Sequence, residues 1–172
     1  MTNIGLIAEG PAENSAVPKD ELMLYGQFVG DWDFDCEYYH ENGVTERVSG
    51  EWHFAWALEG RAIVDLWTFP RLSERARTGE CPGGLGVTVR TYDKEAHEWN
   101  IAWSDSEGFF LFLRGKRSGD EIVQESRDEG GLKKWWIFSE IAPDRFVWRE
   151  EVSRDGGQSR RLSEVMKCRR TH

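Results

Sequence analysis

The clearest pattern in the chain is a strict alternation of large apolar residues with small or polar ones between residues 51 and 58. Trp52, Phe54, Trp56 and Leu58 share one phase of the alternation, and the residues between them share the other. Because successive side chains of a strand point to opposite faces, this stretch predicts a half-buried β-strand with an aromatic inner face.

A hairpin is predicted to follow, because Glu59 and Gly60 can form a two-residue reversal in which glycine adopts a positive φ. The second strand sets four pairs of residues opposite each other: Leu58 with Arg61, Trp56 with Ile63, Phe54 with Asp65, and Trp52 with Trp67. Asp65 then lies as a lone carboxylate on an aromatic face. This arrangement is the strongest indication of function in the sequence.

The remaining pattern predicts one short helix and about ten strands in all. Pro18 to Val29 carries proline and acids in its first turn, so it is predicted to be a short amphipathic helix that ends at Gly30. The strands are predicted over residues 31–38, 44–58, 61–69, 85–92, 99–104, 109–114, 121–126, 133–141, 145–153 and 158–168. Residues 71–84 are rich in charge, glycine and proline, and we expect a long exposed loop there.

The order of these elements predicts the fold class. No crossover helix separates the strands, so the sheet is expected to be antiparallel and meandering. An open sheet of this size has long unpaired edges, and closure removes them. We therefore predict an all-β fold, a single closed antiparallel up-and-down barrel over residues 18–172, preceded by a poorly ordered lead at residues 1–17.

Composition and charge narrow the expected partners. The 172 residues carry a net charge of −9, which works against a nonspecific nucleic-acid partner. No apolar run approaches the roughly 18–20 residues that cross a bilayer, and no signal peptide is recognisable, so we expect a cytoplasmic protein with no membrane partner. The cysteines and histidines lack metal-ligand spacing, so no metal site is expected.

Four segments carry a resemblance to a known class of protein. Gly30-Asp31-Trp32, placed just after the predicted helix, resembles the Gly-x-Trp signature of the lipocalin and calycin superfamily. The segments at residues 50–63, 90–103 and 146–157 resemble an uncharacterised bacterial family of lipocalin-like, calycin-type β-barrels. The resemblance covers residues 28–170. It implies a barrel whose Trp32 closes one end beside a basic residue of the last strand, either Arg169 or Arg170, and it implies no agreed activity.

The related haem-binding nitrobindin group differs from this sequence at the ligand positions. Trp32 is followed by Asp-Phe-Asp-Cys where that group has a glycine-rich repeat, and His172 is the terminal residue. We therefore expect no haem and no other cofactor.

Asp65 and Arg90 are the first candidate site residues. Both are predicted to face the barrel interior, where an unpaired carboxylate is costly and either is neutral or finds a partner. One interpretation is a charged pair that orients a polar group of a ligand. The other is a structural salt bridge that closes the barrel, or an Arg90 that faces solvent.

Large aromatic residues form the second candidate set, because aromatic side chains at a barrel mouth can hold a planar or apolar ligand. The full set of candidate ligand-binding residues is Trp52, Phe54, Trp56, Asp65, Trp67, Arg90, Trp103, Trp136 and Trp148. Ordinary core packing explains the aromatic residues equally well. Glu150 and Glu164 could form a carboxylate pair for acid–base chemistry or part of a solvated rim, in a register that sets Trp148 opposite Glu164 and Glu150 opposite Leu162.

Three functions remain open at this point. The first is binding of a small apolar or aromatic molecule with one polar group inside the barrel. The second is a cofactor-free enzyme of the isomerase, cyclase or decarboxylase type that uses Asp65, Arg90 and Glu150. The third is a homodimeric interaction module whose barrel is filled by its own side chains. An interior pocket that touches Trp52, Asp65, Trp67 and Trp103 would favour the first two.

Overall fold

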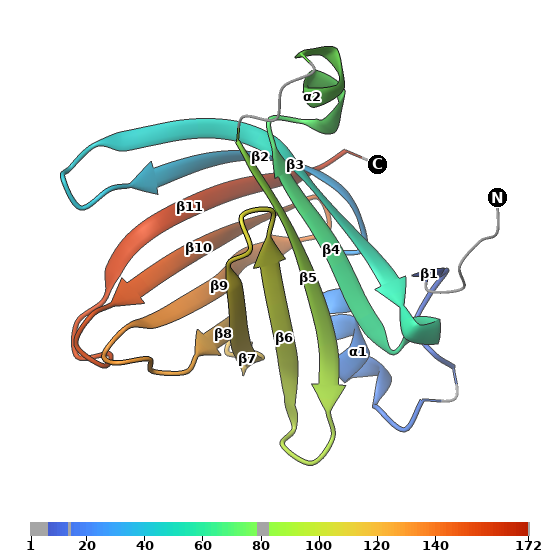
Figure 1. Cartoon of the computed structure of the whole chain (residues 1–172). Coiled ribbons are helices and arrows are strands. Elements are labelled where there is room, and N and C mark those ends of the chain that lie inside the picture. The colour runs from blue at the N-terminus through green and yellow to red at the C-terminus, as the bar shows by residue number, and fades with distance from the viewer. Residues whose placement is uncertain (1–6, 14, 79–82, 172) are drawn as a thin grey trace.

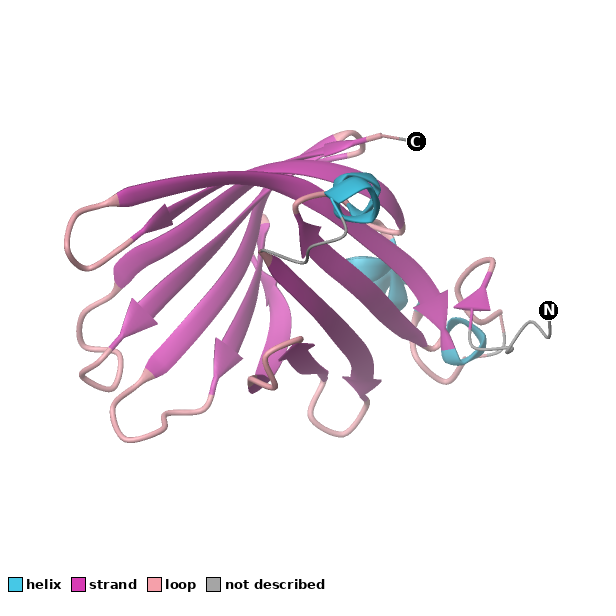
Figure 2. Cartoon of the chain, turned by 45° about the horizontal axis from the view of Figure 1, so that its top comes forward, coloured by secondary structure: helices cyan, strands magenta, loops and turns pink. Residues whose placement is uncertain are grey.

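Ten antiparallel strands close into a barrel in the computed structural model, which describes residues 7–13, 15–78 and 83–171 (Figure 1). The strands are β2 (Gly30–Tyr39), β3 (Thr45–Ala57), β4 (Ala62–Phe69), β5 (Gly84–Asp93), β6 (Glu98–Asp105), β7 (Phe110–Ser118), β8 (Glu121–Ser126), β9 (Lys133–Ala142), β10 (Arg145–Ser153) and β11 (Arg161–Arg170). Each strand pairs with its neighbours in sequence, and β11 pairs with β2 to close the ring. The predicted fold class is confirmed. Figure 2 shows that strands form nearly all of the wall.

The central hairpin has the predicted register. Strands β3 and β4 pair Trp52 with Trp67, Phe54 with Asp65, and Trp56 with Ile63. The reversal is a short 3₁₀ turn, Leu58–Gly60, whose three residues all have positive φ. This turn ends the strand alternation one residue early, so Leu58 is exposed and the prediction that it shares the inner face is wrong.

Helix α1 (Lys19–Gly26) fills one end of the barrel. It is shorter than the predicted 18–29, but Leu22, Tyr25 and Phe28 are buried inside the ring as their spacing indicates. A Cβ atom on Gly26 would lie 2.4 Å from the ring of Trp56, which shows how closely the helix packs against β3. At this end the interior is therefore a packed core.

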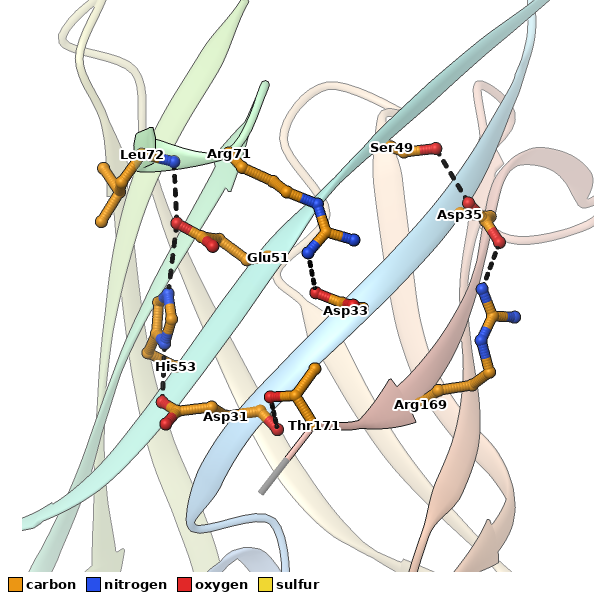
Figure 3. Close-up of polar contacts among 10 residues, drawn as sticks. All are labelled: Asp31, Asp33, Asp35, Ser49, Glu51, His53, Arg71, Leu72, Arg169 and Thr171. Carbon is orange, nitrogen blue, oxygen red and sulfur yellow. Dashed lines mark hydrogen bonds and ion pairs between the residues drawn. The ribbon is translucent and has the colours of Figure 1, made fainter. Parts of the chain in front are cut away.

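Trp32 and Arg170 contact each other beside the helix and close the same end of the barrel. The indole Nε1 of Trp32 donates to the Phe28 carbonyl oxygen at 2.7 Å, and the guanidinium of Arg170 lies 4.1 Å from the Trp32 ring centroid. Arg170 also donates to the carbonyl oxygens of Val29 and Gln27, just after the helix. Of the two arginines that the resemblance offered, Arg170 takes this position, whereas Arg169 pairs with Asp35 on the outer surface (Figure 3).

The segment between β4 and β5 differs from its prediction as a loop, because it contains helix α2 (Leu72–Thr78). Its start is held on the outer face of the barrel: Glu51 accepts from the Leu72 backbone N–H, and Arg71 pairs with Asp33 (Figure 3). Arg75 is buried and donates to the carbonyl oxygens of Phe69 and Gly84, which joins the ends of β4 and β5. The prediction of a loop was wrong for residues 72–78, because these tertiary contacts stabilise a short helix there, and residues 79–82 of the predicted loop lie outside the described residues.

The register between β10 and β11 also differs from the prediction. The structure pairs Trp148 with Met166 and Glu150 with Glu164, and a bulge follows Glu150. The connection spans residues 154–160 instead of three residues, since the Asp155 carboxylate accepts from the hydroxyls of Ser153 and Ser159 and stabilises a wider turn. The shift sets the two glutamates directly opposite each other.

Residues 7–13 of the expected lead are described and include strand β1 (Ile7–Ala8), which pairs with the end of β3. Within the described residues, no helix is long and apolar enough to cross a membrane. Several large apolar side chains on the outer face are exposed: Val87 and Val89 of β5, and Phe110 and Phe112 of β7. The homodimer stays a prediction.

We predict that Arg170→Ala destabilises the fold by about 2–3 kcal/mol, because it removes hydrogen bonds to carbonyl oxygens and the contact with Trp32. Arg169→Ala is the matched control and should cost less than about 1 kcal/mol, since its ion pair is exposed. Urea unfolding of both variants measures the difference. Equal losses would contradict this account of Trp32 and Arg170.

Candidate functional site in the open end of the barrel

A pocket of about 430 Å³ occupies the end of the barrel opposite α1. Its wall is largely aromatic, with seven such side chains: Tyr38, Trp52, Trp67, Trp103, Phe109, Trp136 and Trp148. The glycines at the start of β5 and the loop between β6 and β7 form part of its rim. The barrel interior is thus filled at one end and hollow at the other.

The structure brings most of the predicted site residues to this pocket. Its wall includes the five tryptophans of the candidate set other than Trp56, together with Asp65 and both paired glutamates, Glu150 and Glu164. Phe54 and Trp56 lie nearer to α1, where Phe54 packs 5.8 Å from the Phe28 ring. The pocket expected to touch Trp52, Asp65, Trp67 and Trp103 is present.

Some lining residues were absent from the predicted set. Lys134 precedes Trp136 by two positions on β9, so period-two alternation places both on the inner face and could have identified it. Tyr38 and Met166 follow the same alternation on β2 and β11. Phe109 lies in a loop, where strand periodicity gives no information.

The floor of the pocket is a buried ion pair. The side chains of Asp65 and Arg90 are each 1% exposed, and the Arg90 Nη1 contacts Asp65 Oδ2 directly. The other oxygen, Oδ1, accepts from Trp52 Nε1 at 2.6 Å and from the Thr88 hydroxyl at 2.9 Å. Both predicted orientations are therefore confirmed, and neither charge faces solvent.

Arg90 forms the underside of this floor and is not among the residues that line the pocket. Its guanidinium is 5.1 Å from the Tyr25 ring centroid and 5.7 Å from that of Phe54. Burial lowers the pKa of Arg90 to about 10, so the side chain remains charged at neutral pH. The geometry thus fits a structural ion pair, of which Asp65 alone reaches the ligand space.

The two glutamates on the pocket wall have different surroundings. Glu150 Oε2 accepts from Lys134 Nζ at 2.9 Å and from Trp136 Nε1 at 2.8 Å, and its Oε1 accepts from the Ser163 hydroxyl. Glu164 accepts a hydrogen bond from Cys36 Sγ at 3.3 Å, and the Tyr38 hydroxyl is a second hydrogen-bond partner of its carboxyl group. Burial and then the neighbouring Glu150 raise the pKa of Glu164 to about 8.

The sequence matches no protein-family model, and no curated protein matches it in sequence. Two solved structures share its fold. The Mycobacterium tuberculosis protein Rv2717c superposes with a TM-score of 0.59 at 10% identity, over 88% of this chain and 98% of that one. The S-type phycobiliprotein lyase CPES of Guillardia theta gives a TM-score of 0.57 at 12% identity, over 90% of this chain and 97% of that one. The chain therefore has the lipocalin-like calycin fold that its sequence resembled.

Glu164 predicts a dependence of stability on pH. Its folded-state pKa of about 8 lies above the ordinary value of 4.5, so the folded protein binds the proton more tightly than the unfolded chain. The stabilisation that comes from this tighter proton binding is full below pH 4.5, and it is lost as the pH rises through 8. We expect the unfolding free energy of the native protein, relative to Glu164→Gln, to fall by an amount on the order of 3 kcal/mol between pH 5 and pH 8.5.

Urea unfolding of the two proteins at both pH values measures this difference, and the comparison cancels the groups that titrate in both. Parallel pH profiles for the native protein and Glu164→Gln would contradict the assigned environment of Glu164.

Proposed function

We propose that the protein binds a small, largely apolar, ring-bearing molecule with one polar group in the open end of the barrel. The observation that supports this most directly is the hollow aromatic pocket of about 430 Å³. Ligand pockets of a few hundred Å³, lined by apolar and aromatic side chains with a few polar groups, are typical of small-molecule sites. The acidic side chains that line it are Asp65, Asp105, Glu107, Glu150 and Glu164.

The tryptophan rings are arranged to surround a planar molecule. Trp103 and Trp136 have centroids 5.5 Å apart and planes at 88°, and Trp136 and Trp148 lie 5.5 Å apart at 62°. Since neighbouring rings are steeply inclined, a planar ligand can stack on one ring and meet the edge of another. Both geometries are favourable for aromatic pairs.

Three rings of the pocket leave more surface uncovered than the rings of the packed core, although Trp52, Trp136 and Trp148 are nearly as buried as core residues. Trp32 and Trp99, toward the α1 end, are 1% and 0% exposed. Trp67 and Trp103 of the pocket wall are only partly buried, and Phe109 at the rim is 49% exposed. Aromatic surface left uncovered inside a concave site is what a bound ligand would remove from water.

A second candidate function is proton-transfer catalysis in the same pocket. The observation that favours it is the contrast between Glu150, bound to Lys134, and Glu164, whose pKa is raised. Two carboxylates in such different surroundings can act as base and acid. In that case a bound compound is turned over by the native protein, and Glu164→Gln keeps binding but abolishes turnover.

We predict that prodan, a neutral naphthalene dye, binds with a blue shift of its emission and quenches the tryptophan fluorescence. Trp136→Ala should weaken its binding about tenfold, because the substitution removes a ring of the pocket wall. Trp135→Ala is the matched control: Trp135 is the adjacent residue on β9, packs under Arg160 outside the barrel, and should leave prodan affinity unchanged.

Absence of prodan binding to the native protein would contradict the proposed function. Equal effects of the Trp135 and Trp136 substitutions would show that the dye binds elsewhere.

A further inference from the structure

Acidic side chains outnumber basic side chains in the pocket wall. Five carboxylates line it, those of Asp65, Asp105, Glu107, Glu150 and Glu164. Lys134 is the one basic side chain among the described residues that form the wall, and its ammonium is already bound to Glu150. Asp65 is likewise neutralised by Arg90. The remaining charge of the pocket is therefore negative.

Glu164 is one of three pocket carboxylates without a counter-ion among the described residues, together with Asp105 and Glu107, and it is the one that lies directly opposite Glu150. Across the part of the chain that the structure describes, no basic side chain forms an ion pair with it, and its neighbours are Cys36 and Tyr38 on β2 and Glu150 on β10. Lys134 on β9 is near enough to act on Glu164 but is engaged by Glu150. A second carboxyl group beside Glu150 that has no cation of its own either keeps its proton or pairs with a positive charge brought by a ligand.

The aromatic wall around this position suits a cation as well. A cation within about 6 Å of an aromatic ring is attracted by the negative face of the ring, and tryptophan is the strongest partner. The Lys134 ammonium already lies 6.0 Å from the Phe109 centroid in this wall. Trp136 and Trp148 supply further rings beside the two glutamates.

Building on the proposed binding function, we propose that the polar group of the ligand is an ammonium ion, so that the pocket selects an organic amine with an apolar or aromatic body. The ammonium pairs with Glu164 and lies against the tryptophan rings, while the body of the ligand fills the rest of the cavity. A neutral ligand forms no ion pair with Glu164, and an anion adds to the negative charge of the wall.

This pairing links amine binding to the release of a proton. Glu164 is largely protonated at neutral pH, since its pKa is raised to about 8, and a bound cation favours the ionised form. Binding of an amine at pH 7 should therefore release about one proton per ligand. For the same reason amine affinity should rise about tenfold between pH 6 and pH 7.

Three compounds with the same ring separate the alternatives: 2-phenylethylamine, 2-phenylethanol and 3-phenylpropionate. Isothermal titration at pH 7 in phosphate and in HEPES, which differ in protonation enthalpy, gives both the affinity and the proton count. We expect the amine to bind at least about tenfold more tightly than the alcohol, with proton release, and the acid to bind most weakly.

Glu164→Gln should abolish the amine preference and the proton release. Glu95→Gln is the matched control, since it removes the same charge from the turn between β5 and β6, far from the pocket, and should change neither. If Glu164→Gln fails to fold, the proton count of the native protein decides, and a count of zero overturns the inference.

The outcomes for the two proposals are distinguishable. Equal binding of amine and alcohol, or tighter binding of the acid, overturns the ammonium inference and leaves the binding function standing. If none of the three compounds nor prodan binds, the proposed function fails and the inference fails with it.

Discussion

The buried ion pair between Asp65 and Arg90 divides the interior of this barrel. Two charges in a low-dielectric interior carry a large desolvation cost, which their attraction offsets only when further hydrogen bonds and contacts are in place. Here Trp52 and Thr88 donate to the carboxylate, and Arg90 lies among the rings of Tyr25 and Phe54. Because the pair fixes these side chains, it forms a firm floor between the packed end and the hollow end.

The barrel interior differs on the two sides of this floor. Below it, α1 and the rings of Phe28, Phe138 and Phe146 pack closely, with Phe28 4.8 Å from Phe138 and 4.9 Å from Phe146. Above it, the wall is built from larger indoles that meet edge to face around a cavity. Polar groups enter that cavity mainly as carboxylates, and Glu164 is the one that lies opposite another carboxylate, Glu150, without an ion pair of its own. The proposed ammonium site therefore lies at Glu164.

Short connections made most of the fold predictable from the sequence. The β3–β4 and β5–β6 registers follow from tight turns and strict alternation, and both agree with the structure, including Arg90 opposite Ile101. Alternation also predicted that Asp65 and Arg90 share the interior. Period-two patterns, however, state only which face a residue occupies. They do not state how deep in the barrel it lies.

The position of a residue along the barrel axis is one property that the sequence could not show. Phe54 and Trp52 share one face of β3, yet one packs beneath the floor and the other reaches the pocket, because α1 fills the barrel from one end only. The β10–β11 register depends on a wide turn held by Asp155, which a glycine pair does not reveal. Helix α2 depends on contacts from distant strands, such as Glu51 with Leu72.

The most direct measurement is a double-mutant cycle on the ion pair, with Asp65→Asn, Arg90→Met and the two combined, scored by urea unfolding. Asp65→Asn and Arg90→Met should each cost about 3–5 kcal/mol, because each leaves a buried partner uncompensated. The combined variant should cost clearly less than the sum of the two, since neither unpaired charge remains. Additive losses, or single losses below about 1 kcal/mol, would contradict the claim that this pair organises the barrel interior.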